Sequence, residues 1–121
     1  MNVENYRDYC LAKPGVTEGF PFDEKTLVFK VMGKMYALAD IDVFTSFNVK
    51  CDPERAILLR EQYPEVMPGY HMNKQHWNTV RVDGALPDKL LFSFIDHSYD
   101  LICAGLGKKE KEELEKIKGL M

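Results

Sequence analysis

The chain begins with apolar residues at helical spacing, and the apolar positions later alternate with a period of two. Over residues 3–12 the apolar positions recur every three or four residues, after Asn2, which can cap a helix, and before Pro14-Gly15, which can end one. From Thr26 the apolar positions alternate, and many of the residues are β-branched or aromatic, which suits a pleated strand. The pattern predicts a helix over residues 3–12 and a strand over residues 26–32.

Hairpins continue this strand pattern. Gly33-Lys34 is predicted to form a tight turn, because glycine can supply the positive φ that two-residue connections need. Further strands are predicted over residues 35–39 and 43–50, separated by a turn at residues 40–42. Lys30 is expected on the less buried face of the first strand.

The second half of the chain combines helices with one more strand. Asp52-Pro53-Glu54 is a strong helix start, because Asp can accept from free amides, Pro fits the first helical position and Glu complements the helix dipole. This helix is expected to end before Pro64. Residues 78–82 are typical of a strand, and a helix from Pro87 carries a broad apolar face expected to cover the sheet. A charged tail over residues 108–118 is expected to form a short exposed helix.

The order of these elements predicts an α+β fold with a mostly antiparallel sheet packed by helices. The length of 121 residues and the 45% hydrophobic content fit one domain over residues 1–121. The sequence lacks an apolar run of about 18 residues and an apolar stretch near its start, so we expect a cytoplasmic protein with no membrane partner. Its three cysteines are far apart and never form C-x-x-C, which favours buried free thiols over disulfides or a zinc knuckle.

Residues 66–81 stand out chemically from the rest of the chain. This functional segment, VMPGYHMNKQHWNTVR, holds two histidines, the only tryptophan, two cations and no carboxylate. The whole chain leans the other way, with 16 Lys+Arg against 19 Asp+Glu and a formal net charge of -3. A negatively charged partner would have to be met locally, and the functional segment is where we expect function.

Catalysis and metal binding are the weaker interpretations of this segment. His71 and His76 could each act as a base, but no motif with a known mechanism accompanies them, so structural or surface histidines are favoured. A metal site would need both to converge with Cys51 or His97, and a five-residue separation suits one face of neither a helix nor a strand. We expect no catalytic residue, no metal and no cofactor.

Nucleic-acid binding is the better functional interpretation of the segment. Basic side chains can neutralise phosphates, flat rings can stack on bases, and amides can read base edges. The candidates are Lys30, Lys50, Lys74 and Arg81 for phosphates, Tyr70, His71 and Trp77 for bases, and Asn73, Gln75 and Asn78 for base edges. The competing interpretation is that the segment has no binding role. Tyr and Trp are more often core residues than stacking platforms, and scattered cations are an ordinary solvated surface.

Charged groups outside the segment are expected to be solvated. Asp96 and Asp100 lie one helical turn apart, opposite the apolar stripe of their helix, which indicates solvent exposure and mild repulsion. The lysines of the tail alternate with glutamates, and such near-neutral interleaving is typical of a solvated helix.

Three long stretches resemble a known family. PGVTEGFPFDEKTLVFKVMGKMYAL, NVKCDPERAILLREQYPEVMPGYHMNKQHWNTV and IDHSYDLICAGL are similar to the MmcQ/YjbR family, and the resemblance runs from about Tyr9 to Lys109. It implies a double-wing α+β fold similar to the DNA-binding C-terminal domain of the phage transcription factor MotA. Family members are commonly labelled DNA-binding on that similarity. The resemblance supplies no catalytic residues, and it carries over only Lys30, Lys50 and the segment from Tyr70 to Trp77, His76 included, as a candidate nucleic-acid-binding surface.

Two hypotheses from different classes follow. In the first, the protein binds nucleic acid, with DNA favoured over RNA: Lys50, Lys74 and Arg81 contact phosphates, and His71, Asn73 and Trp77 face bases. In the second, it is a small-molecule or peptide-binding module whose pocket is lined by Tyr70, His71, His76 and Trp77, with the lysines as orienting charges for an anionic ligand. Salt dependence separates them, because phosphate contacts release counterions. A monomer is compatible with either hypothesis, and the oligomeric state stays open.

Overall fold

Six strands form one antiparallel sheet, in the order β1-β2-β3-β4-β6-β5. The computed structural model describes all residues from Met1 to Met121. The strands are β1 (Val16–Gly19), β2 (Thr26–Val31), β3 (Lys34–Asp40), β4 (Ser46–Lys50), β5 (Val66–Pro68) and β6 (Trp77–Arg81), and the helices are α1 (Val3–Leu11), α2 (Pro53–Gln62), α3 (Asp88–Ala104) and α4 (Lys108–Gly119). This arrangement confirms the expected α+β fold with an antiparallel sheet packed by helices.

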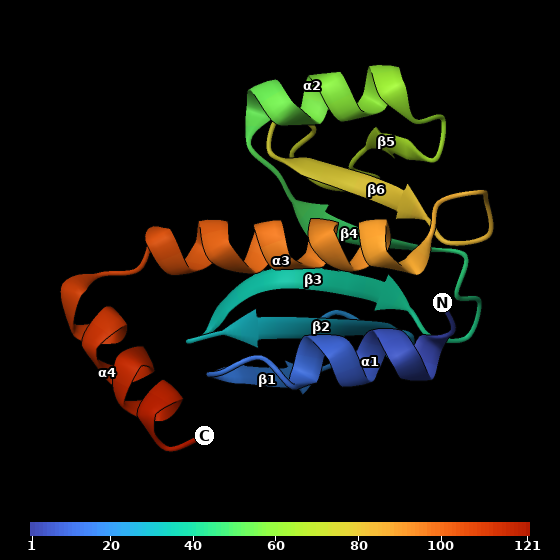
Figure 1. Cartoon of the computed structure of the whole chain (residues 1–121). Coiled ribbons are helices and arrows are strands. Elements are labelled where there is room, and N and C mark those ends of the chain that lie inside the picture. Colours follow the sequence, from blue (N-terminus) through green and yellow to red (C-terminus); the bar gives the residue numbers. More distant parts are fainter.

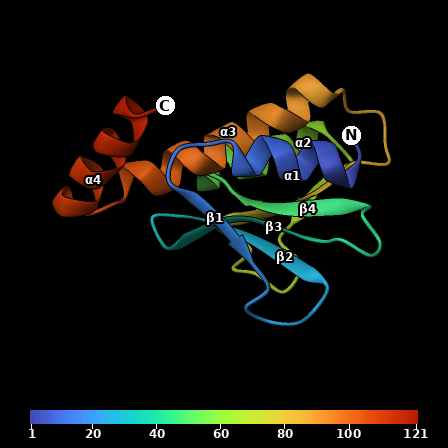
Figure 2. The ribbon, with the colours of Figure 1, turned by 90° about the horizontal axis from the view of Figure 1, so that it is seen from below.

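The helices gather on one side of the sheet (Figures 1 and 2). α3 packs across β2, β3 and β4, while α1 packs against β1 and α2 against β5. α4 follows α3 and turns away from the sheet (Figure 1). The other side of the sheet carries loops and no helix (Figure 2). We call the two sides the helix-covered face and the open face.

The main core lies between the sheet and the helices. Tyr6 of α1 stacks on Phe47 of β4, with ring centroids 5.3 Å apart, and meets Phe29 of β2 edge-on at 5.6 Å. The predicted apolar face of α3 points into this core, where Leu91 and Ile95 are fully buried. A cluster of 17 buried residues results, and it holds the sheet and helices together.

The predicted helix starts are confirmed in atomic detail. The side chain of Asn2 accepts a hydrogen bond from the amide of Asn5 at 2.8 Å, and a capping box opens α1. The side chain of Asp52 accepts from the amide of Arg55 at 3.1 Å, with Pro53 in the first turn of α2. The charged tail forms α4, which is anchored by buried Leu114.

The hairpin between β2 and β3 turns one residue earlier than predicted. Met32 and Gly33 are the turn residues, with φ of 49° and 82°, and Lys34 already pairs with Val31. Two consecutive left-handed residues match the twist of the flanking strands better than a single one, which moves the turn away from Gly33-Lys34. The side chain of Met32 then packs beside Gly15, where Leu114 of α4 also contacts the chain.

The strand predictions missed two edge strands and began one strand too early. β1 and β5 are short edge strands that the alternation pattern did not reveal. The predicted strand over residues 43–50 begins only at Ser46, because the side chain of Asp40 accepts from the amides of Asp42 and Val43 and holds that stretch in a turn.

Candidate binding groove on the open sheet face

The open face is basic at one end of the sheet. The register pairs Lys30 with Met35 and Lys50 with Trp77, all at the end of the sheet where β2 and β4 finish. We call these four residues the basic row. Lys30 and Lys50 are half-buried and form no ion pair, and the row contains no carboxylate. The basic row therefore carries positive charge.

A groove of about 770 Å³ lies on the same face, between two loops. One wall is the β1–β2 loop with Phe22 and Asp23, and the other is the loop over residues 69–76 between β5 and β6, with Tyr70, His71 and Met72. The floor comes from β3, β4, β5 and β6 and includes Leu38, Ser46, Asn48, Met67 and Thr79. We call this the open-face groove.

The floor of the open-face groove holds the 69–76 loop in place. The hydroxyl of Thr79 donates to Asn48 Oδ1 at 2.5 Å and accepts from the amide of Tyr70 at 2.9 Å. Gly69 lies so close to β6 that an added Cβ would sit 2.8 Å from Trp77 Cβ, which leaves room for glycine only. His71 adopts a left-handed φ of 58°, an uncommon conformation that turns the chain at the groove.

Arg60 of α2 fixes the same loop from the helix-covered face. Its guanidinium donates to Asn78 Oδ1 at 2.8 Å, to the carbonyl of Trp77 at 3.1 Å and to the carbonyl of Lys74. Asn78 is buried, so this charge-assisted hydrogen bond satisfies an otherwise costly polar group. The loop that walls the groove is thus held at both faces of the sheet.

The charges that line the groove are acidic. Asp23 and Asp40 line it, and no lysine or arginine does. Backbone amides of Thr26 and Lys25 donate to the Asp23 carboxylate and hold its pKa below its usual range. The open face therefore divides into the basic row at one end and the acidic groove at the other.

Three of the predicted site residues contribute to the groove or its support. Tyr70, 69% exposed, and exposed His71 line the groove with their rings 4.0 Å apart. Trp77 is 9% exposed and packs with Val28 and Leu38, so its ring supports the open face from within. Trp77 also shares the face of Thr79 and Arg81, which agrees with the alternation expected along this strand.

The other predicted residues have internal partners or lie apart from the groove. The ammonium of Lys74 donates to the carbonyl of Gly69 at 3.2 Å, and the guanidinium of Arg81 pairs with Asp83 at 2.8 Å. Asn73 caps the turn of its own loop by accepting from the amide of Gln75. The carbonyl of His76 accepts from Cys51, and its half-buried side chain does not line the groove.

Sequence reasoning missed the opposite wall and the acidic lining. Phe22, Asp23 and Asp40 lie far from the functional segment in sequence, and only the sheet brings them opposite Tyr70. One local signal was available: Phe20 and Phe22 flank a proline in a loop and stay exposed, at 46% and 66%. Exposed aromatic residues in a loop are more often recognition residues than structural ones.

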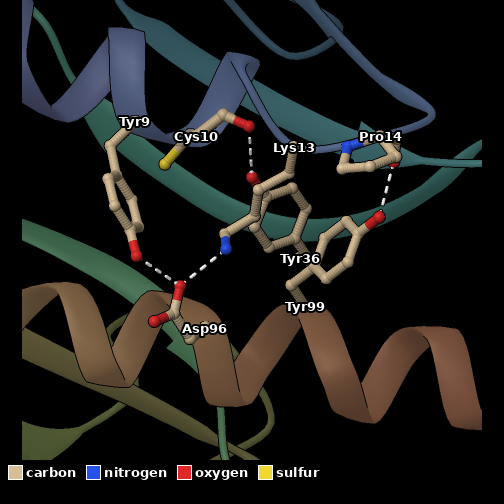
Figure 3. Close-up of polar contacts among 7 residues, drawn as sticks. All are labelled: Tyr9, Cys10, Lys13, Pro14, Tyr36, Asp96 and Tyr99. Atoms are coloured by element: carbon tan, nitrogen blue, oxygen red, sulfur yellow. Dashed lines mark hydrogen bonds and ion pairs between the residues drawn. The ribbon is translucent and has the colours of Figure 1, made fainter. Parts of the chain in front are cut away.

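A second polar cluster joins α1 to α3 (Figure 3). Asp96 accepts from Tyr9 Oη and from Lys13 Nζ, each at 2.6 Å, although its side chain stays 44% exposed; Asp100 is exposed, as expected. Lys13 also lies over the rings of Tyr9 and Tyr99, 4.9 and 5.1 Å from their centroids. Sequence alone placed Asp96 opposite the apolar stripe, but the end of α1 folds back onto that side of α3.

The groups of this cluster are poorly suited to catalysis. Burial raises the pKa of the Cys10 thiol to about 12, and burial together with the Asp96 hydrogen bond raises the pKa of Tyr9 to about 12. Both stay protonated at neutral pH, so neither is an activated nucleophile or base. The hydroxyls of Tyr36 and Tyr99 donate to the carbonyls of Cys10 and Pro14 (Figure 3). The cluster is a structural clamp.

Two other features of the fold bear on possible sites. A small cavity under α2, lined by Cys51, His97 and others, has a volume of about 10 Å³, which is room for one water molecule at most. No group of three His, Cys, Asp or Glu side chains lies together in a way that could hold a metal ion. None of the helices is long and apolar enough to cross a bilayer.

Comparison with known proteins places the chain in a family. The family model described as YjbR matches residues 11–101. The chain belongs to the YjbR family. The matched residues include both loops that wall the groove and exclude α4.

Relatives and solved structures match most of the chain. The uncharacterized protein YjbR of Escherichia coli K12 is 36% identical over 94% of this chain and 97% of its own length, and the uncharacterized protein YbdF of Escherichia coli O157:H7 is 33% identical over 92% of each. The crystal structure of a Deinococcus radiodurans protein with the domain DUF419 aligns with a TM-score of 0.86 and 44% identity, over 94% of this chain and 88% of that one. A Pseudomonas syringae crystal structure aligns with a TM-score of 0.71 and 31% identity, over 84% of this chain and 98% of that one.

Proposed function

We propose that this YjbR-family protein is a non-catalytic binding protein whose small-molecule ligand occupies the open-face groove. One observation carries the proposal: a groove of about 770 Å³ on the only sheet face without helices. That volume falls in the range of ligand pockets, roughly 300 to 1,000 Å³. Apolar side chains such as Leu38 and Met67 alternate there with hydroxyl and amide groups such as Ser46 and Asn48, which is the usual lining of such pockets.

Rigid walls support this proposal further. The 69–76 loop is held by Thr79 from below and by Arg60 from the other face. A pocket whose walls are fixed before binding loses little conformational entropy when the ligand enters. This geometry ranks the second sequence hypothesis above the first, with a different lining: Tyr70 and His71 face the groove, while His76 and Trp77 do not line it.

The absence of catalysis is part of the proposal. His71 is the one histidine that lines the groove, and its side chain forms no hydrogen bond that would orient it as a base. Catalytic bases are usually oriented by a third group. Tyr9 and Cys10, whose pKa values are raised, lie in the clamp between α1 and α3, outside the groove.

A fragment screen by NMR tests the proposed function. We expect small neutral aromatic amides to shift the amide signals of Tyr70, His71 and Ser46. Ser46→Trp, which fills the groove, should abolish these shifts, and Glu112→Trp on exposed α4 is the control for an added tryptophan. Shifts that map outside the groove, or that persist in Ser46→Trp, would contradict the proposal.

Nucleic-acid binding is the second candidate, favoured by the basic row. Lys30 and Lys50 lie at one end of the open face without ion-pair partners. Two phosphate contacts would give affinity that falls with salt, by a log–log slope of about -1.4 for single strands. Lys74 is a poorer phosphate ligand than expected, because its ammonium already donates to Gly69.

Fluorescence anisotropy with a short single-stranded DNA separates this candidate from the first. If nucleic acid is bound, the double variant Lys30→Ala with Lys50→Ala should bind more weakly at low salt. Its slope of log affinity against log salt concentration should be less steep by about 1.4. Lys109→Ala with Lys116→Ala, in exposed α4, is the matched control. DNA affinity that is immeasurable at low salt, or equal in both double variants, would reject the candidate.

A further inference from the structure

The groove has a one-sided charge that calls for a specific ligand class. Among its fifteen lining residues the only formally charged side chains at neutral pH are Asp23 and Asp40. Neither forms an ion pair with a lysine or arginine. Lys25 lies near Asp23 but does not line the groove. Carboxylates beside apolar walls, with no lysine or arginine among the lining residues, favour a ligand that brings its own positive charge.

Backbone hydrogen bonds position both carboxylates in advance. Asp40 Oδ1 accepts from the amides of Asp42 and Val43 at 2.8 and 3.1 Å, while Oδ2 has no partner in the protein. Asp23 is held by the amides of Lys25 and Thr26 and by the Thr26 hydroxyl. Asp40 therefore presents a free, oriented acceptor oxygen at the groove, and binding a cation there needs little reordering of the side chain.

Aromatic rings stand on both walls. Phe22 on one loop and Tyr70 on the other are 66% and 69% exposed, and both line the groove. A cation over an aromatic face at an exposed site binds about two- to fivefold more tightly than without the ring. The same rings can contact the apolar body of a ligand, so they suit a molecule that joins a cation to a hydrophobic group.

We propose that the open-face groove binds a small organic cation, an ammonium or guanidinium group carried on an apolar body. This inference rests on the proposed function and names its ligand class. The cationic group hydrogen-bonds to Asp40 Oδ2 with Asp23 nearby, and the apolar body lies between Phe22 and Tyr70. The two loops bound the groove on both sides, which suits a small molecule better than a long peptide.

NMR titration of the full chain with three matched probes tests the charge preference. Phenethylammonium should bind about tenfold more tightly than neutral 2-phenylethanol, and anionic 3-phenylpropanoate more weakly than either. Asp40→Asn keeps the Oδ1 acceptor and should bring the ammonium down to the affinity of the alcohol, without changing the alcohol. Asp42→Asn, a neighbour whose side chain does not line the groove, should change neither.

A second variant guards against a folding defect in Asp40→Asn. Tyr70→Leu removes an exposed ring and should weaken ammonium binding about threefold.

The capped tripeptide acetyl-Ala-Lys-Ala-amide should bind no better than phenethylammonium, and markedly tighter binding of the tripeptide would overturn the small-molecule assignment.

The outcomes separate this inference from the proposed function. Equal binding of the ammonium and the alcohol in the groove would overturn the cation preference and leave the proposed function standing. Binding of all three probes that persists in Ser46→Trp, or no binding by any of them, would overturn both. Ammonium binding that falls to the affinity of the alcohol in Asp40→Asn and is weakened in Tyr70→Leu would support both.

Discussion

The two faces of the sheet are formed by alternate residues of the same strands, but they are covered differently. On the helix-covered face, Phe29 and Phe47 pack under α1 and α3 in a cluster of 17 buried residues. On the open face, Val28, Leu38 and Trp77 form a cluster of three, joined by Met35 and Met72. One face gains a thick core and stability, while the other is covered by loops alone and keeps a groove. The same strands thus serve folding on one side and, we propose, binding on the other.

The open face itself is divided. Its basic row offers two unpaired lysines, and its groove offers two carboxylates and exposed aromatic rings. A polyanion and an organic cation would therefore prefer different ends of one surface. Charge on this face has to be considered by region, because the net charge of -3 describes neither end.

Truncation in the helix-covered core should have the largest effect on stability. Phe47 is buried and stacks on Tyr6, so Phe47→Ala is expected to lower the free energy of unfolding by about 3 to 5 kcal/mol. Urea denaturation followed by far-UV circular dichroism measures this change. Phe47→Leu is the milder control. A loss below that of an open-face truncation would break the comparison between the faces.

Trp77→Ala should be the most costly change on the open face. The ring packs on Val28 and Leu38 under Met72, and we expect a loss of about 3 kcal/mol, the lower end for tryptophan, because only a loop covers it. Binding in the groove should weaken as well, since the 69–76 loop loses its support. A variant as stable as the parent that no longer binds its ligand would show Trp77 to be a recognition residue instead.

Removing the Arg60 guanidinium should cost less. Arg60→Met leaves buried Asn78 without its donor and frees the carbonyl of Lys74, while the carbonyl of Trp77 still accepts from the amide of Gly69; we expect a loss of about 1 to 3 kcal/mol. Arg60→Lys should restore only part of this, because an ammonium lacks the planar fork. Hydrogen exchange should speed up at Gly69 and Trp77. Unchanged exchange there would mean that the loop is held from the open face alone.

A pH effect should be the smallest and should come from the helix-covered side. Burial, with Arg55 nearby, lowers the pKa of His97, whose Nε2 accepts from the amide of Asp52. The unfolded chain therefore binds a proton more readily, so stability should fall as pH drops through about 6.5 and below. The pKa values of Glu18, Asp23 and Asp83 are also lowered, so the stability that these carboxylates contribute is lost only at more acidic pH.

Denaturant melts at about pH 7.5 and about pH 5.5 measure this effect. His97→Gln keeps an acceptor but does not titrate, and its stability should change less between the two conditions. Equal pH dependence in both proteins would assign the effect to other groups.

Local signals in the sequence were sufficient for the helices and the central hairpin. Asn2 and Asp52 cap helices because a side-chain acceptor satisfies free amides next to it in the chain. The alternation over β2 was visible because each strand residue faces one side or the other. The edge strands β1 and β5 were missed, since three or four residues carry too little pattern and their pairing depends on partners elsewhere in the chain.

The sequence by itself determined the α+β fold class, the helix caps and the unusual composition of the segment around Tyr70 and His71, because each depends on neighbouring residues. Only the tertiary structure decided on which face of the sheet that segment lies. Register brings Asp40 of β3 opposite a loop some thirty residues away, and the packing of α1 onto α3 makes Asp96 part of a clamp. Burial of Trp77 and exposure of Phe22 likewise follow from what lies above each strand, a non-local property that spacing along the chain does not encode.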